Sequence, residues 1–435
     1  MSRYHSLFFL CLLVMTSGCK KQSSPTHAAI KNESTPQKTA LPASNDQRGL
    51  LLSYAQFVTN EAGEVTAKPG PARFDLLWQQ DGDWKTEQLE DNDSNVFHKS
   101  FPFTLPSGKE GIVTLGGTEA IVKFWTRSAP GQFSARILWQ KQFGGKFNRM
   151  RDAEYAKVLD GPYPDLVVGT HDQGVVALLN FKKNDDVSVT ELDKQPNTFI
   201  HEIEIGDLDS DGILEVYSTP SEPNKLKGGA QHGSVVRYVP KKHQGRSIVA
   251  DLGNRHAKEI LVDDVDGDGK DELYVAVEAL TEDSSQGTKI IEPVEIRRFD
   301  ADTPADKGIR IAAIPDRLCR FLSVGDIDGD GKKEMVAAAF RSGLWLLKPS
   351  SDPKKQWDTK NIDRKSSGFE HAALFADLDN DGKDELYVAA DEQGEVRQYS
   401  WQGGKIKRQS ILKHKVPKAL MTWNIVSFPL SLLEP

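Results

Sequence analysis

One nine-residue pattern, Asp-x-Asp-x-Asp-Gly-x-x-Glu, occurs four times in this 435-residue chain and constrains its fold more than any other feature. The copies begin at Asp207, Asp264, Asp326 and Asp377, so their first residues are 57, 62 and 51 positions apart. Alternating apolar and polar residues precede each copy, as at 203–205, and a β-rich stretch follows it, which predicts a strand on both sides. A period of about 50 to 60 residues with such strands is typical of a four-stranded propeller blade.

Weaker copies extend the series toward the N-terminus. Residues 160–165 keep the turn and the following strand but lack the three alternating aspartates, and residues 107–110 keep even less of the pattern. One acidic residue precedes the second strand of each predicted blade: Glu110, Asp165, Glu215, Glu272, Glu334 and Glu385. Six blades are therefore visible in the repeats.

A seventh blade is predicted from strands that remain at the two ends. Residues 419–428 form one apolar C-terminal strand without companions, and residues 50–57, 74–79 and 84–89 form three N-terminal strands without a fourth. If the C-terminal strand is innermost in a blade completed by the three N-terminal strands, the ring closes without an exposed edge. We therefore predict an all-β fold, a seven-bladed β-propeller over residues 48–435 with four-stranded blades, and six blades are the alternative.

Each loop of the pattern places hard oxygen donors around one point, as Ca²⁺ requires. Carboxylates stand at positions 1, 3, 5 and 9, a backbone carbonyl stands at position 7, and the glycine at position 6 allows the turn. The predicted ligands are Asp207, Asp209, Asp211, Ile213, Glu215, Asp264, Asp266, Asp268, Lys270, Glu272, Asp326, Asp328, Asp330, Lys332, Glu334, Asp377, Asp379, Asp381, Lys383 and Glu385. The sequence thus predicts up to four calcium ions.

Two other interpretations of these loops are weaker. A plain Asp-Gly turn with solvated carboxylates needs only one Asp and one Gly, whereas the extra carboxylates here repel one another unless a cation neutralises them. An EF-hand needs a Glu at position 12 and flanking helices, but the four copies have Ser218, Val275, Ala337 and Val388 there and are flanked by predicted strands.

The loops and their spacing resemble the FG-GAP or VCBS repeat family, which includes the calcium-loop blades of the integrin α-subunit propeller. The resemblance covers roughly residues 95–415. It implies a propeller with calcium in the loop between the first and second strands of a blade. The family usually has Asp at position 9, where this chain has the longer Glu, which should still reach the ion. The degenerate loop around Asp160 and Asp165 is not expected to bind a metal.

A second regularity lies six residues before position 1 of each loop, where the residue is basic. These residues are Arg151, His201, Lys258, Arg320 and His371, with Arg151 included if the shortened second loop begins at Lys157. Because the first strand of a blade lines the channel, they should gather near the channel mouth opposite the calcium loops. We predict a site for an anionic ligand, such as a carboxylated glycan or a phosphate group. Alternatively, each contacts a carboxylate such as Glu202 or Glu370.

The N-terminus predicts export and a lipid anchor. Residues 1–18 combine Arg3, an apolar stretch and small residues before Cys19, as a signal peptide does. This arrangement resembles the lipobox of bacterial lipoproteins, in which the cysteine is lipidated, although Thr16 departs from the usual aliphatic residue, so ordinary cleavage is the alternative. Lys20 favours the outer membrane by resemblance to the sorting rule of Gram-negative bacteria. Residues 19–47 are polar and predicted to be a disordered tether.

Composition limits the function. The net charge of −8 argues against nucleic acid as a partner, and no zinc-spaced Cys/His cluster or inferable catalytic triad stands out. We predict a monomeric, membrane-anchored, calcium-binding module that binds a protein or an anionic glycan and is not an enzyme. One alternative is a propeller enzyme of the polysaccharide lyase or dehydratase kind, for which the sequence offers no matched base. A spacer or assembly scaffold is the other.

Overall fold

The computed structural model describes residues 47–145, 148–223, 229–284, 287–416 and 418–434, which form β-strands joined by turns and three single-turn 3-10 helices. Those helices are η1 (Pro240–Lys242), η2 (Asp391–Gln393) and η3 (Leu430–Leu433). Within these residues, no helix has the length and hydropathy that a membrane crossing requires. The predicted signal peptide, Cys19 and all but the last residue of the predicted tether lie outside the described residues.

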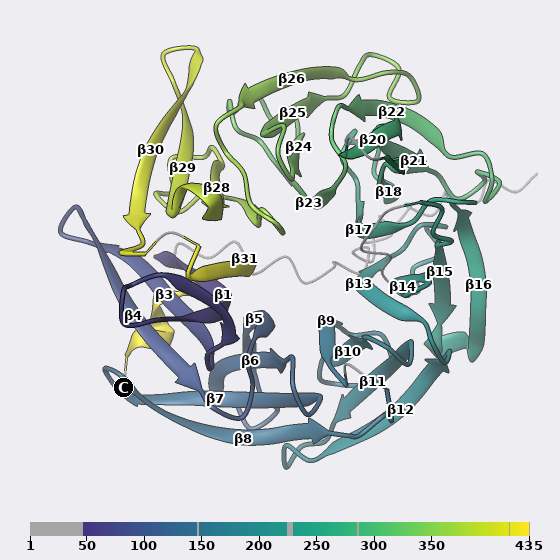
Figure 1. The fold of residues 1–435 in the computed structure, drawn as a ribbon. Coiled ribbons are helices and arrows are strands. Elements are labelled where there is room, and N and C mark those ends of the chain that lie inside the picture. The colour runs from purple at the N-terminus through teal and green to yellow at the C-terminus, as the bar shows by residue number, and fades with distance from the viewer. Residues whose placement is uncertain (1–46, 146–147, 224–228, 285–286, 417, 435) are drawn as a thin grey trace, which may run out of the picture. The chain divides into compact units, whose positions relative to one another are not determined.

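The strands form seven blades of antiparallel strands arranged in a ring (Figure 1). Blade 1 contains β5 (Phe97–Thr104), β6 (Glu110–Gly116), β7 (Ile121–Ala129) and β8 (Gln132–Gln140). Blade 2 contains β9 (Met150–Ala156), β10 (Asp165–Thr170), β11 (Val175–Phe181) and β12 (Val187–Lys194). Blade 3 contains β13 (Phe199–Gly206), β14 (Glu215–Ser221), β15 (Ser234–Val239) and β16 (Gln244–Asp251). The predicted seven-bladed β-propeller is confirmed, and the six-bladed alternative is wrong.

The second half of the ring repeats this order. Blade 4 contains β17 (Ala257–Asp263), β18 (Glu272–Val277), β21 (Val294–Phe299) and β22 (Ile309–Ile314). Blade 5 contains β23 (Cys319–Gly325), β24 (Glu334–Ala339), β25 (Leu344–Lys348) and β26 (Asp358–Asp363). Blade 6 contains β27 (Ala373–Ala376), β28 (Glu385–Ala390), β29 (Glu395–Gln402) and β30 (Lys405–Lys413).

Blade 7 joins the two ends of the propeller. The C-terminal β31 (Leu420–Pro429) is innermost and pairs with β1 (Arg48–Thr59), which is followed by β3 (Ala72–Gln80) and β4 (Asp83–Asp91). The pairing of β1 with β31 runs from Arg48 opposite Pro429 to Gln56 opposite Leu420. The pairing of β31 with β1 joins the two ends of the chain in one sheet and leaves neither strand with an unpaired edge there. The ring therefore closes in the way predicted from the terminal strands.

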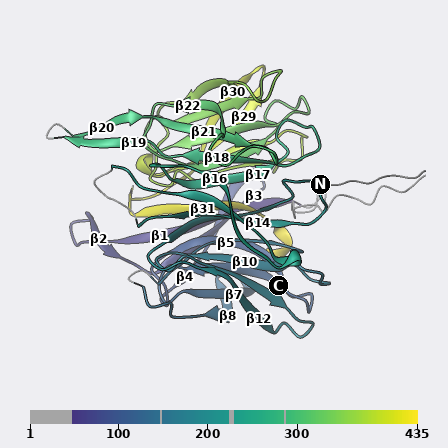
Figure 2. The same cartoon turned by 90° about the vertical axis from the view of Figure 1, so that its right-hand side faces the viewer.

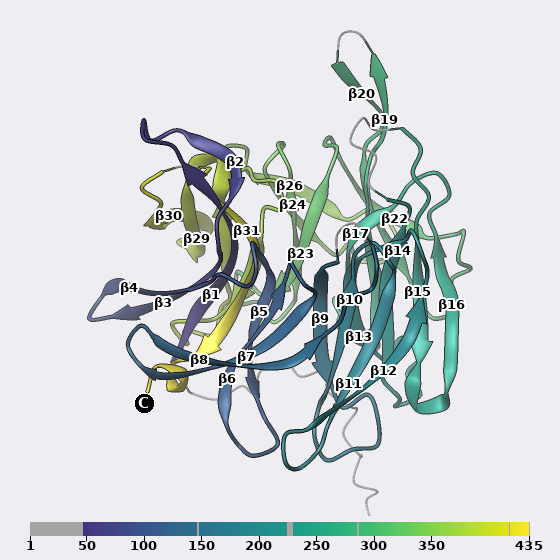
Figure 3. The same ribbon diagram turned by 60° about the horizontal axis from the view of Figure 1, so that its bottom comes forward.

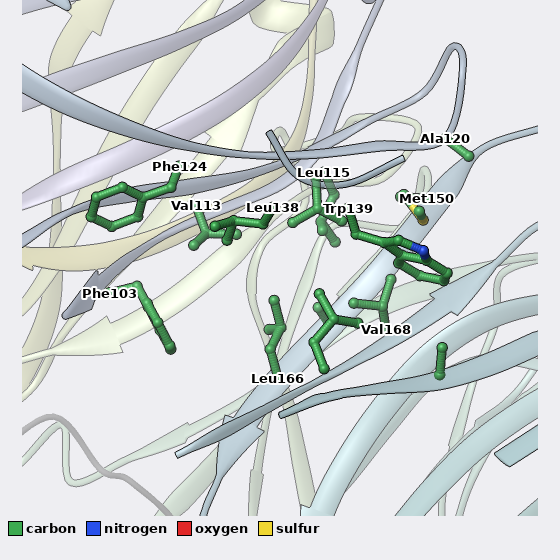
Figure 4. Packing of buried hydrophobic residues seen from close by; sticks show 14 of the residues in the cluster. Phe103, Val113, Leu115, Ala120, Phe124, Leu138, Trp139, Met150, Leu166 and Val168 are labelled. Carbon is green, nitrogen blue, oxygen red and sulfur yellow. The ribbon is translucent and has the colours of Figure 1, made fainter. Parts of the chain in front are cut away.

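Apolar side chains from facing blades fill the spaces between them. Figure 4 shows this packing between blades 1 and 2, where Phe103, Val113 and Leu115 face Leu166 and Val168. All five of these side chains are at most 4% exposed. Burying one such side chain contributes about 1.5–3 kcal/mol, so the inter-blade layers supply much of the stability of the ring.

An inserted hairpin explains the longest interval between repeats. Strands β19 (Leu280–Ser284) and β20 (Gly287–Glu292) pair only with each other and lie between the second and third strands of blade 4. They project from the blades as a separate ribbon (Figures 2 and 3). A second excursion, β2 (Val65–Pro69), pairs with the far end of β1 in blade 7.

Candidate metal loops and a charged channel

The four copies of the acidic pattern form four equivalent loops, residues 207–215, 264–272, 326–334 and 377–385, which we call the acidic loops. Each joins the first and second strands of its blade: β13 to β14, β17 to β18, β23 to β24 and β27 to β28. Because the innermost strands of a propeller run in the same direction along the axis, all four acidic loops lie at the same end of the ring.

The loop of blade 4 shows how the pattern folds. Asp264 Oδ1 accepts hydrogen bonds from the backbone N–H of Gly267 at 2.8 Å and of Asp268 at 3.1 Å, and Asp264 Oδ2 accepts one from Gly269 at 3.0 Å. The glycine at position 6 has a φ between +80° and +87° in all four acidic loops. A residue with a Cβ would be strained in this conformation, so positions 1 and 6 together build the turn.

The carboxylates of each loop converge. In each acidic loop, a group of three or four side chains offers oxygen atoms that all lie within 4.8 Å of one another. The groups are Asp207, Asp209 and Asp211; Asp264, Asp266, Asp268 and Glu272; Asp326, Asp328 and Glu334; and Asp377, Asp379 and Glu385. Oxygens about 2.4 Å from a common centre would have such separations, and a set made only of oxygen donors suits Ca²⁺.

Three predicted carboxylate ligands fall outside these groups. Glu215 is held by Arg237 at 2.8 Å and by the Tyr217 hydroxyl. Asp330 accepts a hydrogen bond from the Lys332 backbone N–H at 2.9 Å.

Asp381 is the third predicted carboxylate ligand outside the groups, and it lies 3.5 Å from Lys383 Nζ.

In each acidic loop, the N–H of the position-7 residue donates to the position-5 carboxylate at 2.9 Å. These contacts hold the backbone N–H groups of Ile213, Lys270, Lys332 and Lys383 against the position-5 carboxylates.

The position-9 glutamates lie beneath the loops, and each is at most 3% exposed. In blade 4, Arg298 on β21 reaches Asp266 at 2.5 Å and Glu272 at 3.1 Å, and the Tyr274 hydroxyl donates to Glu272 at 2.9 Å. Third-strand cations therefore neutralise part of the loop charge. These residues are not apparent from the sequence, because a basic residue on a strand that is distant in sequence belongs to no motif.

Blades 3 and 5 have the same arrangement. Arg237 lies 3.4 Å from Asp209, in addition to its contact with Glu215. Lys348 lies 2.7 Å from Asp328 and 2.6 Å from Glu334.

Blade 6 differs from the other three. Its third strand has Gln398 opposite Tyr387, where blades 3 and 4 have Arg237 and Arg298 opposite the equivalent tyrosines. Gln398 donates to the Tyr387 hydroxyl at 3.1 Å rather than to a loop carboxylate. Burial raises the pKa of Glu385 to about 7, and the negative charge of Asp379 adds to this rise. Among the described residues, therefore, no third-strand cation contacts the acidic group of blade 6.

The degenerate blade 2 loop contains no comparable group among its described residues. Asp165 is buried and accepts hydrogen bonds from Asn180 Nδ2 at 2.7 Å and from the Leu159 N–H at 2.9 Å. Asp160 pairs at 2.7 Å with Lys241 from the neighbouring blade. Both carboxylates thus have protein partners.

The predicted basic residues lie near the starts of the innermost strands. Arg151, His201, Lys258 and Arg320 are 2–8% exposed and lie close enough for their charges to act on one another. Glu370 joins two of them across the ring, at 2.8 Å from Arg320 Nη1 and 3.5 Å from Arg151 Nη2, and Glu278 lies 3.2 Å from Arg320 Nε. We call Arg151, His201, Lys258, Arg320, Glu278 and Glu370 the channel cluster.

His371 does not join this cluster. Burial lowers the pKa of His371 to about 4, so its imidazole is neutral. Nδ1 donates to the Ala339 carbonyl at 2.7 Å, and Nε2 accepts from Ser366 Oγ at 2.8 Å. Both ring nitrogens therefore have local partners, and the structure brings together four of the five predicted residues.

Strand register reveals a sixth basic residue at the same position. In blade 1, Phe101 pairs with Val113 as Ile203 pairs with Ser218 in blade 3, which places Lys99 in register with His201. Lys99 Nζ is bound by Asp152 at 3.0 Å and Glu154 at 2.6 Å. The sequence analysis missed Lys99 because the shorter loop of blade 1 shifts the spacing on which the alignment depended.

Comparisons with known proteins agree with the repeat and the fold. Residues 326–388 match the family model for an FG-GAP-like repeat, which spans the acidic loops of blades 5 and 6. No curated protein matches the chain in sequence.

Several solved propellers share the fold at low identity. A protein from Bacteroides fragilis assigned as a 6-phosphogluconolactonase is 10% identical with a TM-score of 0.52, covering 89% of this chain and 99% of its own. The periplasmic gluconolactonase of Pseudomonas aeruginosa is 11% identical with a TM-score of 0.50, covering 86% of this chain and 98% of its own. The Dos1 propeller is 7% identical with a TM-score of 0.51, covering 86% of this chain and 91% of its own. At such identities the likeness shows the fold alone. The chain is therefore a seven-bladed β-propeller that contains an FG-GAP-like repeat.

Proposed function

We propose that this protein is a calcium-binding propeller module, displayed on a membrane through a lipid on Cys19, that binds a protein or glycan ligand. Calcium in the acidic loops would stabilise the ring, and the remaining surface would be available for recognition. The lipobox-like N-terminus supports export to the bacterial envelope, with Lys20 favouring the outer membrane.

The repetition of one acidic group in four blades is the observation that carries this proposal. Each group is assembled by the same turn and uses oxygen atoms only, and the groups of blades 4, 5 and 6 include a glutamate withdrawn from solvent. Such carboxylates repel one another and lose hydration, and a divalent cation offsets both costs. Three loops also recruit a basic side chain, which neutralises a single charge at most.

A propeller enzyme is the second candidate, and the channel cluster is where its base would lie. A general base needs a carboxylate or imidazole with a pKa near the working pH. Burial opposes ionisation of Glu278, but Lys258 and Arg320 hold its pKa well below the usual range, and Arg320 also binds Glu370. These contacts favour a binding site over a catalytic one.

Melting curves with and without a chelator test the calcium claim. A ligand that binds only the native state adds about 2.7 kcal/mol per site at a concentration a hundredfold above its Kd. We expect the chelator to lower the melting midpoint and calcium, added in excess, to restore it. An unchanged midpoint in the chelator would refute the proposal.

A further inference from the structure

Lys258 is the cation of the channel cluster whose charge is offset only at a distance, by Glu278 and Glu370. The residue is 5% exposed, and no hydrogen bond or ion pair joins its Nζ to any described residue. Burying a charged group without a partner is strongly unfavourable, and a lysine ammonium has three protons to donate. An acceptor from outside the described chain, either water or a ligand, would complete the hydrogen bonds of this ammonium group.

The neighbouring carboxylates are already engaged. Glu370 is shared by Arg151 and Arg320, while Glu278 binds Arg320 and lies 2.9 Å from His256 Nε2. The channel cluster thus has three cationic side chains and two carboxylates. Burial and the positive charges of Arg320 and Arg151 outweigh the opposing charges of Glu278 and Glu370 and lower the pKa of Lys258 to about 8.

The next layer of the channel does not supply the missing negative charge. Asp152 is bound by Lys99 at 3.0 Å. Burial raises the pKa values of Glu202 and Glu259 well above their usual range, which disfavours the charged forms of these two carboxyls. The channel cluster therefore keeps one more cationic side chain than carboxylates, which favours an anionic ligand.

Other unused polar atoms lie on and beside Arg151. Arg151 Nε and Trp423 Nε1 are buried donors without a partner among the described residues. His98 donates from Nδ1 to the Met150 carbonyl at 2.6 Å, which leaves its buried Nε2 as an acceptor without a partner in the described chain. The His98 ring meets the Trp423 ring at 4.5 Å, and the Arg151 guanidinium lies 5.0 Å from the centre of the same ring.

We propose that the channel cluster binds a small hydroxy acid. The carboxylate would accept hydrogen bonds from Lys258 and Arg151, a hydroxyl group would donate to His98 Nε2, and the carbon skeleton would contact Trp423. Several donors, one acceptor and an aromatic ring match this class better than a bare inorganic anion or a neutral sugar. The inference deepens the proposed role as a binding module but does not depend on calcium.

The channel cluster and the acidic loops are well separated. Lys258 precedes position 1 of its loop by six residues, and a strand rises about 3.3 Å per residue, which places the two about 20 Å apart. A ligand at the channel cluster should therefore bind without contacting a metal in an acidic loop.

Calorimetric titration of the full-length protein in detergent micelles tests the proposed ligand class. The probes are galacturonate as the hydroxy acid, galactose as its neutral counterpart and inorganic phosphate as an anion without a carbon skeleton. We expect galacturonate to bind at least tenfold more tightly than either of the others. Equal or tighter binding of phosphate or galactose, or no binding of galacturonate, would overturn the inference.

Lys258→Met identifies the site, with Lys405→Met on the exposed outer strand of blade 6 as the matched control. We expect Lys258→Met to weaken galacturonate binding by roughly a hundredfold, because a desolvated charge partner is lost. The melting midpoint of the ligand-free protein should not fall. A large drop in that midpoint with unchanged affinity would mark Lys258 as structural and refute its role in binding.

A milder variant provides a second test in case Lys258→Met does not fold. Trp423→Phe keeps an aromatic ring but removes the indole N–H, so we expect it to weaken galacturonate binding by about tenfold. Unchanged affinity in this variant would contradict the placement of the ligand beside Trp423. If the chelator leaves the midpoint unchanged while galacturonate still binds, the calcium claim fails and this inference stands.

Discussion

Gln398→Arg should make the blade 6 loop less dependent on calcium. Gln398 faces Tyr387 as Arg298 faces Tyr274 in blade 4, and Arg298 reaches both Asp266 and Glu272. An arginine at position 398 would have the same access to Asp379 and Glu385. Gln398 also borders a cavity of about 200 Å³ that the longer side chain could enter.

The magnitude follows from the blade 4 contacts. Two unit charges about 3 Å apart attract by roughly 5 kcal/mol at an effective dielectric constant of 20, and desolvation of the guanidinium offsets much of this. A charge-assisted hydrogen bond leaves about 1.5–3 kcal/mol of net stabilisation. We therefore expect Gln398→Arg to raise the free energy of unfolding in chelator by about that amount. The additional stabilisation by calcium should decrease correspondingly, because the guanidinium competes with the ion.

Chemical unfolding of wild type and variant, each with calcium and with chelator, measures this difference. Gln132→Arg, on the exposed end of β8 in a blade without an acidic loop, is the matched control and should change neither value. The reasoning is refuted if Gln398→Arg does not stabilise the protein in chelator, or if its response to calcium equals that of the wild type.

Two further predictions concern pH and location. Burial raises the pKa of Asp391 to about 7, although Thr422 donates two hydrogen bonds to it. Between its unfolded pKa of about 4 and pH 7 the folded protein binds the additional proton, so this group's contribution to stability is greatest at low pH and falls by roughly 4 kcal/mol as pH rises. Asp391→Asn should remove this fall in stability between about pH 4 and pH 7. Identical profiles of unfolding free energy against pH in wild type and variant would contradict the assignment. Cys19→Ser should move the protein from the membrane fraction to the soluble fraction, and wild type already in the soluble fraction would exclude lipidation.

The fold could be predicted from the sequence because the repeat is both regular and local. The spacing of Asp207, Asp264, Asp326 and Asp377 fixed the blade length, and the strands left at the two ends required the closing blade. The interval of 62 residues between Asp264 and Asp326 concealed the hairpin β19–β20, since an insertion changes the length of a blade without changing its pattern.

The candidate sites could be predicted only in part. Loop carboxylates lie within nine residues of one another, so their convergence follows from a single turn. Arg298 and Glu272, however, are 26 positions apart in sequence and meet only when the third strand pairs with the second. The carboxylates of the channel cluster, Glu278 and Glu370, come from different blades and likewise become neighbours only through closure of the ring.

Counting the calcium bound per chain tests the central claim most directly. After equilibrium dialysis against buffered calcium, metal analysis should give four ions per native chain, one for each acidic loop. It should give three when Asp377 and Asp379 are both replaced by Asn. A native chain without bound calcium, or one whose count is unchanged by that double substitution, would contradict the account.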